Sequence, residues 1–319
     1  MRIYHPKAYI MMRAHNVDSF IEKSINSVLN QDYKNLKLII LNDNSTDNTL
    51  NIINKKAKDD NRIEVISANN NSAALSAEQI MRYTASKVFN TDFVFMLDSD
   101  DFFSNSFVIS DVMEKVAQTK ANICGLGFHY EFADDNAKNL ILQAGMGVPH
   151  NSLMKKLSEL SSGATVSENK DIATNWDTPM WNKAIRGDMF KRYVSLLPSF
   201  DRQAKVCEDF PTTLLLLFKD SKLTAVDDAY AFFKHYSSST VAPVITDFTV
   251  DRIGFLNITN GIYKNNKDLF APEAEEVINN FISKKYDVIS SIVQTKINQG
   301  FLNGFSVAEF QRIFKEKIK

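Results

Sequence analysis

Residues 24–49 read SINSVLNQDYKNLKLIILNDNSTDNT and contain three patterns in a row. Apolar residues at helical spacing come first, a run at residues 36–41 that is apolar except for Lys37 follows, and a loop rich in Asp and Asn comes last. A run that is apolar at every position is typical of a strand covered on both faces, as in a parallel sheet. The stretch therefore predicts a helix, a buried strand, and a polar loop that leaves the carboxyl end of that strand.

The same alternation of patterns continues on both sides of this stretch. Apolar or alternating runs predict further strands at residues 8–12, 62–67, 93–97 and 121–130. A capping-box pattern at residues 19–22 predicts the start of the first helix, and a further helix is predicted over residues 73–88. Strands that alternate with helices form right-handed βαβ units, so we expect the α/β fold class with a mainly parallel sheet. Ligands bind such sheets beyond the carboxyl ends of the strands.

The bulk composition is that of a soluble globular protein, with 319 residues of which 44% are hydrophobic and 24% charged. The formal net charge of -1 provides no global basic field, so nucleic acid is not an expected partner. Cys124 and Cys207 lie far apart in sequence and form neither a disulfide framework nor a metal-binding CxxC, which fits a reducing compartment. Residues 1–16 lack a signal-peptide cleavage site, and no apolar run reaches the ~18–20 residues of a membrane span. We therefore expect a cytoplasmic protein.

The patterns are weaker in the second half of the chain. Residues 133–150 and 161–175 are polar, and either segment could form a loop near a site. Apolar order returns at residues 180–193, 210–218 and 224–236. Residues 237–243 have the composition of a linker, and the chain beyond them is predicted to be helical, with its longest apolar stripe at residues 277–297.

The stretch FVFMLDSDDFF, at residues 93–103, places three carboxylates directly after a predicted buried strand. Asp and Asn favour turns and helix caps, and this is the role we expect for Asp47 and Asp101. Asp98 and Asp100 form a D-x-D pair, whose spacing aims two oxygen ligands toward one crevice. Mg²⁺ binds in this way, through one or two carboxylates together with substrate phosphates. Because a lone D-x-D is common by chance, it indicates a site only together with a second feature.

Five segments provide that feature, because together they resemble family 2 glycosyltransferases with the GT-A fold, in the family's order. They are RAHN at residues 13–16, the quoted residues 24–49, FMLDSDD at residues 95–101, MWNKAIRGDMF at residues 180–190, and CEDF at residues 207–210. The resemblance implies a GT-A fold, Rossmann-like, with a catalytic domain at residues 1–240. Its nucleotide-sugar half spans about residues 1–130 and its acceptor half about residues 131–240. Residues 241–319 match no part of the family and are expected to form a helical C-terminal extension.

The resemblance implies that a nucleotide-sugar donor, commonly UDP-linked, lies across the strand ends. Asp43 takes the position that contacts uracil, where a carboxylate accepts the uracil N–H in a charge-assisted hydrogen bond. The family often has glycine at the position of Asn44, so Asn44 is expected to take the left-handed turn there, which asparagine tolerates. Arg13 and His15 fall in the first-strand loop on the donor side. An aromatic ring often stacks near the base at the position of His15, and an ordinary polar surface residue is the alternative.

The same resemblance assigns Asp98 to the ribose and donor, and Asp100 to a divalent cation, Mn²⁺ or Mg²⁺. Such a cation bridges the two phosphates and neutralises charge on the leaving diphosphate. Arg82 lies where the family often has an arginine that faces the diphosphate, although the local sequence departs from the family pattern. A solvated helix face is the alternative place for Arg82. His235 lies where some relatives supply a third metal ligand, although a lone histidine more often has another role.

An E-D motif supplies the general base in family members, and here it consists of Glu208 and Asp209. We favour Asp209 as the carboxylate that takes the proton of the acceptor hydroxyl while its oxygen attacks the anomeric carbon. Direct attack inverts the anomeric configuration. Glu208 is the alternative base, and an acidic helix start is the alternative role for both residues. Trp181, Asn182 and Lys183 lie near the site in the family, where they either line the acceptor side or support the fold.

The function implied is an inverting, metal-dependent transfer of a sugar from a UDP-sugar to a glycan or lipid-linked glycan, in the synthesis of capsule, lipopolysaccharide or a similar surface polysaccharide. A nucleotidyltransferase of sugar-nucleotide synthesis would use a related sheet. It usually carries a Gly-rich basic loop after the first strand, whereas RAHNVDS has no glycine. A non-catalytic carbohydrate-binding protein on the same fold is the third candidate, and the intact acids argue against it.

Apolar residues after residue 270 repeat at helical spacing, as in Ile278, Phe281 and Ile282. Packing against the catalytic domain, or against a second subunit in a homo-oligomer, is the preferred explanation. A helix on the membrane surface is the alternative, because residues 309–319 are mildly basic and would favour anionic lipid. That arrangement would place the protein on the inner face of the plasma membrane, beside a lipid-linked acceptor.

Overall fold

The structure is a computed structural model that describes residues 5–70, 72–133, 158–159, 161–165, 182–200, 210–234, 248–298 and 312. One eight-stranded sheet runs through these residues, with the strand order β3-β2-β1-β4-β7-β6-β8-β5. Its strands are β1 (Ala8–Ala14), β2 (Leu36–Asp43), β3 (Ile63–Ala68), β4 (Phe93–Met96), β5 (Phe102–Phe103), β6 (Ile123–Phe132), β7 (Lys183–Arg186) and β8 (Leu223–Lys234). The helices are α1 (Ile21–Leu29), α2 (Thr49–Asp59), α3 (Ala73–Lys87), α4 (Val108–Thr119), α8 (Gly187–Leu196), η1 (Phe210–Thr212), α9 (Thr213–Leu217), α10 (Phe248–Asn265), η2 (Lys267–Leu269) and α11 (Ala274–Asn298).

Most neighbouring strands of the sheet run in parallel. β1 lies between β2 and β4 and is parallel to both, and β2 is parallel to β3. β7 is antiparallel to both β4 and β6, so β6 runs in the same direction as β4. β8 is parallel to β6. The carboxyl ends of β1, β2, β4, β6 and β8 therefore meet at one edge of the sheet, and the expected α/β class with a mainly parallel sheet is confirmed.

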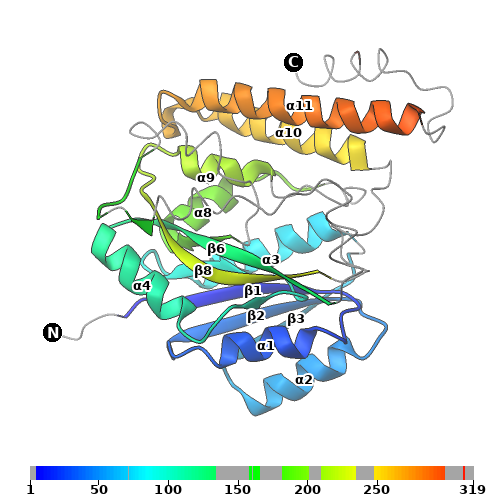
Figure 1. The fold of residues 1–319 in the computed structure, drawn as a ribbon, viewed down its shortest axis with the longest axis vertical. Coiled ribbons are helices and arrows are strands. Elements are labelled where there is room, and N and C mark those ends of the chain that lie inside the picture. The colour runs from blue at the N-terminus through cyan, green and yellow to red at the C-terminus, as the bar shows by residue number, and fades with distance from the viewer. Residues whose placement is uncertain are drawn as a thin grey trace.

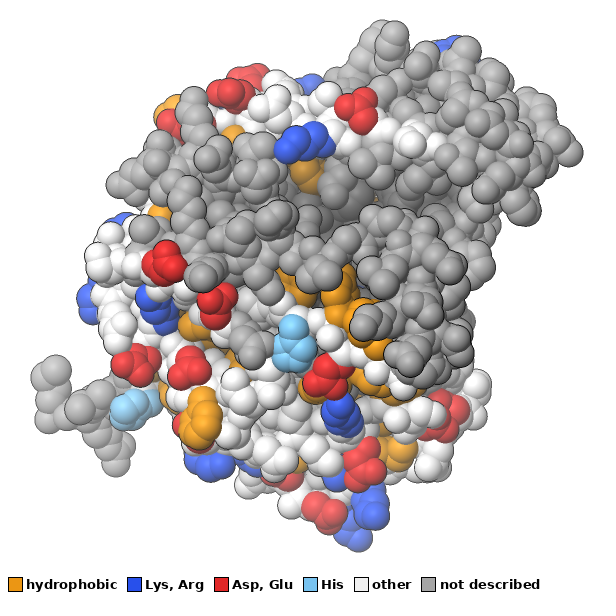
Figure 2. All heavy atoms as spheres, viewed as in Figure 1, with side chains coloured by type: hydrophobic (Ala, Val, Ile, Leu, Met, Phe, Trp, Pro, Cys, Tyr) orange, Lys and Arg blue, Asp and Glu red, His pale blue; other side chains and the backbone are white. Residues whose placement is uncertain are grey.

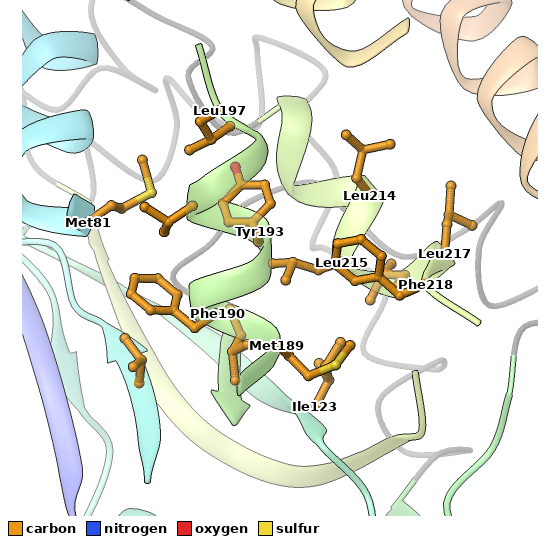
Figure 3. Close-up of a cluster of buried hydrophobic side chains, with 14 of the residues drawn as sticks. Met81, Ile123, Met189, Phe190, Tyr193, Leu197, Leu214, Leu215, Leu217 and Phe218 are labelled. Carbon is orange, nitrogen blue, oxygen red and sulfur yellow. The ribbon is translucent and has the colours of Figure 1, made fainter. Parts of the chain in front are cut away.

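Helices cover both faces of the sheet (Figure 1). In β2, Leu38 and Ile40 belong to the buried cluster that contains α1 and α4, whereas Ile39 and Leu41 belong to the cluster that contains α3, α8 and α9. Both faces of the strand are therefore buried, which explains why residues 38–41 are apolar at every position. Figure 3 shows the second cluster, where Phe190 and Tyr193 of α8 pack with Leu214 and neighbouring residues of α9.

The C-terminal helices α10 and α11 form an outer layer over α8 and α9 (Figure 1). Leu256 of α10 and Ile278 of α11 belong to the same buried cluster as α8 and α9. Phe255 meets Phe200 edge to face, with ring centroids 5.0 Å apart. The expected packing of this segment against the preceding part of the chain is thus confirmed up to Ile282, and the stripe at residues 307–314 lies outside the described residues. None of the described helices is both long enough and apolar enough to cross a membrane.

Two local predictions at helix starts have opposite outcomes. The capping box is wrong, because α1 has Phe20 as its N-cap and no side-chain cap, which leaves Ser19 one position too early. Glu22 instead pairs with Lys56 of α2, with 2.8 Å between Oε1 and Nζ. For Asp47 the turn role is confirmed, because its Oδ1 accepts from the backbone N–H of Thr49 at 3.0 Å, although the N-cap of α2 is Asn48.

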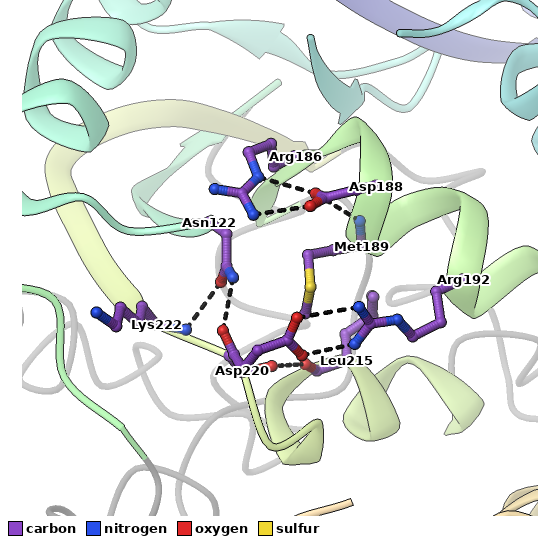
Figure 4. A network of polar contacts seen from close by, with 9 residues as sticks. Asn122, Arg186, Asp188, Met189, Arg192, Leu215, Asp220 and Lys222 are labelled. Atoms are coloured by element: carbon purple, nitrogen blue, oxygen red, sulfur yellow. Dashed lines mark hydrogen bonds and ion pairs between the residues drawn. The ribbon is translucent and has the colours of Figure 1, made fainter. Parts of the chain in front are cut away.

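Polar contacts tie the strands together at the opposite edge of the sheet, away from the carboxyl ends of β4 and β8 (Figure 4). Arg186, at the end of β7, donates two hydrogen bonds to Asp188 at 2.8 and 2.7 Å. Arg192 of α8 binds both carboxylate oxygens of Asp220, at 2.5 and 3.0 Å. Asn122 donates to the Asp220 carbonyl at 2.7 Å. On the face shown in Figure 2, acidic and basic side chains are interspersed among the described residues.

Candidate active site

The loop after β4 holds the four residues Asp98, Ser99, Asp100 and Asp101, and they alternate in burial. Asp98 and Asp100 are half-buried, whereas Ser99 and Asp101 are buried. The backbone N–H of Asp101 donates to the Asp98 carbonyl at 3.1 Å, which closes the loop into a turn. The hydroxyl of Ser24, on α1, lies 2.9 Å from the Ser99 carbonyl and 2.5 Å from the Asp101 carbonyl. The turn is therefore fixed to α1 through the backbone carbonyls of its two buried residues, and Asp98 and Asp100 are its more exposed members.

Asp101 is not the local cap that its sequence position predicts. Its carboxylate accepts from the hydroxyl of Tyr230 at 2.9 Å and from the backbone N–H of Phe233 at 2.7 Å, both on β8. Burial and the neighbouring carboxylates of Asp98 and Asp100 raise the pKa of Asp101 well above its usual range. A side chain that is 2% exposed finds its hydrogen-bond donors in the strand it packs against rather than in the next turn.

Asp43 stands at the end of β2 and is held by the segment that joins β3 to α3. Its Oδ1 accepts from the backbone N–H of Asn70 at 2.8 Å, and its Oδ2 accepts from the hydroxyl of Ser76 at 2.8 Å. Asn70 also donates from its side-chain amide to Ser76 and to Gln79, at 3.1 and 2.8 Å. Sequence patterns gave no signal for Asn70 or Ser76, because both act across the fold.

The loop after β1 is joined to the loop after β2. His15 Nδ1 lies 2.6 Å from the carbonyl oxygen of Asp43, and because a carbonyl only accepts, Nδ1 carries the proton. The side-chain carbonyl of Asn16 accepts from the backbone N–H of Thr46 at 2.8 Å. Asn44 has a φ of 52°, which confirms the expected left-handed turn. These contacts hold the exposed His15 ring beside Asp43.

Arg13, at the end of β1, and Arg82, in α3, both contact protein groups. Arg13 donates from Nη1 to the carbonyl of Ala73, the first residue of α3, at 2.8 Å. Arg82 donates to Glu78 at 2.8 Å and to the carbonyl of Leu197 at 2.9 Å. It lies about 13 Å along the helix from Ala73, given the helical rise of 1.5 Å per residue. The structure thus places Arg82 in a link between α3 and the segment after α8, and its diphosphate role stays a prediction.

The W-N-K segment lies beside the D-x-D loop. β7 pairs with β4 so that Phe95 faces Ala184, and one further step of this register brings Lys183 next to Met96, two residues before Asp98. Asn182 and Lys183 are both buried, and Lys183 Nζ donates to the Asn182 side chain at 2.6 Å. The pairing of β7 with β4 therefore places Asn182 and Lys183 close to the D-x-D loop. Trp181 lies outside the described residues, as do Glu208, Asp209 and His235.

The strand order places the two acidic features on either side of β1. Asp43 ends β2 and Asp98 follows β4, and both strands are neighbours of β1. Adjacent strands are about 4.8 Å apart, so the strand ends that carry these acids are separated by roughly 10 Å. His15 and Arg13 lie at the end of the strand between them. An elongated ligand with an N–H donor at one end and a charged group at the other would span this edge.

The D-x-D pair fits a divalent cation that shares its coordination with a ligand. No group of three or more His, Cys, Asp or Glu side chains comes together among the residues that the structure describes. Asp98 and Asp100 supply two half-buried carboxylates on one side of the turn. Mg²⁺ and similar cations bind through one or two carboxylates plus phosphate oxygens and water. This donor set therefore suits a cation that binds together with a diphosphate.

Comparison with protein families gives a match to the model described as "Glycosyl transferase family 2", over residues 9–173. A curated relative, the uncharacterized glycosyltransferase EpsJ of Bacillus subtilis, is 26% identical over 239 residues, which cover 75% of this chain and 64% of EpsJ. A Campylobacter jejuni protein named GalNAc(5)-diNAcBac-PP-undecaprenol beta-1,3-glucosyltransferase is 29% identical over 120 residues, or 38% of each chain. The chain thus spans less than two thirds of the length of these relatives.

Solved structures share the fold at low sequence identity. S. aureus TarS 1-349 in complex with UDP-GlcNAc has a TM-score of 0.59 and 17% identity, and the match covers 89% of this chain and 83% of that chain. The mannosyltransferase PcManGT from Pyrobaculum calidifontis, in complex with GDP-Man and Mn²⁺, has a TM-score of 0.52 and 10% identity. Its match covers 98% of this chain and 85% of that chain. The resemblance in fold thus extends over most of the chain.

Proposed function

Because this chain belongs to glycosyl transferase family 2, we propose that it transfers a sugar from a UDP-sugar to a hydroxyl of a glycan or lipid-linked glycan. The observation that carries the proposal is the placement of Asp43 and the pair Asp98 and Asp100 on either side of β1, at one edge of the sheet. A nucleotide-sugar has its base at one end and its diphosphate at the other, so it can contact both acidic features at once.

Asp43 supports a base that presents an N–H to it. The two donors from Asn70 and Ser76 hold the carboxylate in one orientation, so a lone pair can meet an imide N–H of uracil. Guanine also presents N–H groups, and a structural neighbour binds GDP-Man, so a GDP-sugar belongs among the donors to be tested. Cytosine has no N–H at the equivalent ring nitrogen and should bind poorly. His15, held beside Asp43, would contact the base through its ring.

The reaction proposed is a single displacement. The acceptor oxygen forms a bond to the anomeric carbon while the bond from that carbon to the diphosphate oxygen breaks, so UDP leaves and the configuration inverts. Asp209 takes the hydroxyl proton, with Glu208 as the alternative base. Asp100 would hold a divalent cation, with Asp98 facing the ribose and donor, and the cation would offset the charge that grows on the diphosphate. His235 is proposed as a further ligand, and Trp181, Asn182 and Lys183 as residues on the acceptor side.

The acceptor proposed is a hydroxyl of a surface glycan or of its lipid-linked precursor. The C. jejuni relative carries undecaprenol in its name, which supports a lipid-linked acceptor for this chain. Such an acceptor requires the enzyme to work at the inner face of the plasma membrane, as a peripheral protein of the cytoplasm. The described parts of α10 and α11 pack on α8 and α9, so a membrane contact would involve their outer faces or the residues beyond them.

A panel of nucleotide-sugars tests the proposal directly. UDP-glucose, UDP-GlcNAc, UDP-galactose, UDP-GalNAc and GDP-mannose would each be incubated with the protein and either MnCl₂ or EDTA, and nucleoside diphosphate release measured. We expect release from at least one UDP-sugar, in MnCl₂ and not in EDTA. Release from GDP-mannose alone would overturn the assignment of uracil to Asp43. Absence of binding and release with every donor would overturn the proposed transfer.

A further inference from the structure

We infer that Tyr230 and Asp101 are positioning residues that hold the D-x-D carboxylates in the arrangement that binds a divalent cation, an inference that rests on the proposed function. Neither residue belongs to the cation's own ligands. Both are buried, and they join β8 to the turn after β4, although 129 residues separate them in sequence. The positioning role belongs to the hydroxyl of Tyr230 rather than to its ring.

The Tyr230 hydroxyl binds both ends of the turn. It accepts from the backbone N–H of Asp98 at 3.3 Å and donates to the carboxylate of Asp101 at 2.9 Å. Asp98 and Asp101 are the first and last residues of the turn, and they are also joined directly through their backbones at 3.1 Å. The hydroxyl is completely buried, so leaving either of its hydrogen-bonding roles unmet would be costly. The turn conformation that meets both roles is thereby favoured.

Asp101 is fixed from the opposite side as well. Its second oxygen accepts from the backbone N–H of Phe233, three residues along β8 from Tyr230, at 2.7 Å. Phe102 then pairs with Ala231 of the same strand, which carries the attachment beyond the turn. The turn therefore cannot rotate without breaking contacts to β8. Packing alone would explain a phenylalanine at residue 230, but it does not require a hydroxyl with two partners in the turn.

The bonds between the turn and β8 restrain Asp98 and Asp100. Their carboxylates repel one another and would separate in a loose loop, whereas a cation site requires its ligands to be held within about 0.5 Å of the binding geometry. Ser99 and Asp101 are buried, whereas Asp98 and Asp100 are only half-buried, so the two D-x-D residues are the acids of the turn that a ligand can reach. The bonds to Tyr230 and Ser24 thus offset the repulsion before any cation arrives.

Calorimetric titration of UDP into the full-length protein, in MnCl₂ and in EDTA, tests the inference without any need for the acceptor. Mn²⁺ should increase the affinity of the protein for UDP, and we expect the factor of this increase to be about fivefold smaller in Tyr230→Phe. That is the effect of losing one or two net hydrogen bonds. UDP affinity in EDTA should stay unchanged, because it depends on Asp43. Tyr193→Phe is the matched control: Tyr193 is also buried but belongs to the other core cluster, and this variant should retain the full Mn²⁺ effect.

A second variant separates positioning from general weakening of the fold. Asp101→Ala should reduce the Mn²⁺ effect as Tyr230→Phe does, and the double variant should lose less than the sum of the two, because both changes break the bond between these residues. Raising the MnCl₂ concentration should restore UDP binding in a correctly folded but poorly positioned variant, and would not do so for an unfolded fraction. A Tyr230→Phe variant with the full Mn²⁺ effect would overturn the inference alone. A wild-type protein whose UDP binding ignores Mn²⁺ would overturn it together with the metal-dependent function.

Discussion

Phe218 and Phe270 stack face to face, with ring centroids 5.0 Å apart and ring planes inclined by 11°. Phe218 follows α9, and Phe270 follows η2 in the C-terminal extension. Backbone hydrogen bonds flank the pair, from Ala271 to the Leu217 carbonyl at 2.8 Å and from Lys219 to the Leu269 carbonyl at 3.1 Å. The extension is therefore joined to the end of α9 by a buried aromatic pair and two backbone hydrogen bonds.

Truncation after Pro243 should destabilise the protein, because it removes α10 and α11 from a shared core. Phe270→Ala is the smaller form of the same test and should lower the free energy of unfolding by about 3–5 kcal/mol. Urea unfolding followed by circular dichroism measures both. Phe89→Ala, at a side chain that is 68% exposed, is the matched control and should have little effect. A truncated chain that stays folded and soluble would instead favour a membrane or partner role for the extension.

Lowering the pH should reduce the contribution of the ion pair between Arg192 and Asp220 to the free energy of unfolding (Figure 4). The hydrogen bonds from Arg192 lower the pKa of Asp220 below its ordinary value of about 3.9. Stability from a carboxylate of lowered pKa is present above the unfolded pKa and is lost as the pH falls through the folded value. The pair is partly exposed, so its contribution should be only about 0.2–1 kcal/mol.

Urea unfolding of wild type and Asp220→Asn from pH 6 to pH 3 measures this loss. The difference in unfolding free energy between them should be constant above about pH 5 and should shrink below about pH 4. Phe89→Ala, at an exposed side chain that does not titrate, should show no such trend. A difference between wild type and Asp220→Asn that does not change with pH would show that the pair contributes through packing alone.

Asp43→Asn should weaken UDP binding by about tenfold or more, because the charge-assisted acceptor for the uracil N–H is lost. It should also reduce the preference for UDP over CDP, since an amide can donate to the cytosine ring nitrogen. Ser76→Ala should weaken UDP binding less, by about fivefold, because it only releases the orientation of Asp43. Calorimetry with both nucleotides measures these effects. Retention of the wild-type preference in Asp43→Asn would place the base elsewhere.

The sequence predicts the strands and the acidic edge because those features are local. A run such as residues 38–41 is apolar at every position, and parallel topology then brings the loops of successive strands to one edge. The left-handed turn at Asn44 follows instead from the resemblance to the family, and asparagine is one of the few residue types that tolerate the positive φ. Predictions of this kind depend on neighbours along the chain, and the structure confirms them.

Long-range contacts could not be predicted in the same way. Asp101 has the sequence context of a cap, yet burial beneath β8 gives it partners more than a hundred residues away. Tyr230 lies within an ordinary apolar run, and nothing in that run indicates its contact with the turn after β4. Ser19 precedes a helix with the spacing of a capping box, but the helix begins one position too late for it.

Divalent cations should strengthen UDP binding, and Asp100→Asn should remove that effect. The carboxylates of Asp98 and Asp100 provide only part of a coordination shell, so the cation and the diphosphate should each raise the affinity for the other. Calorimetry of UDP with MnCl₂, MgCl₂ or EDTA measures this coupling, and uridine, which has no phosphate, is the control. Equal affinity for UDP in all three conditions would contradict the metal role of Asp100.

Asp209→Asn should abolish sugar transfer while it leaves UDP affinity nearly unchanged, because a general base acts on the acceptor and not on the donor. Loss of a general base typically costs about 10²–10⁴-fold in rate. Glu208→Gln is the matched variant, one residue away and with the same change of charge, and should retain more activity if Asp209 is the base. Transfer would be measured with the donor identified by the nucleotide-sugar panel, and UDP affinity by calorimetry. Wild-type turnover in Asp209→Asn, together with loss of turnover in Glu208→Gln, would assign the base to Glu208.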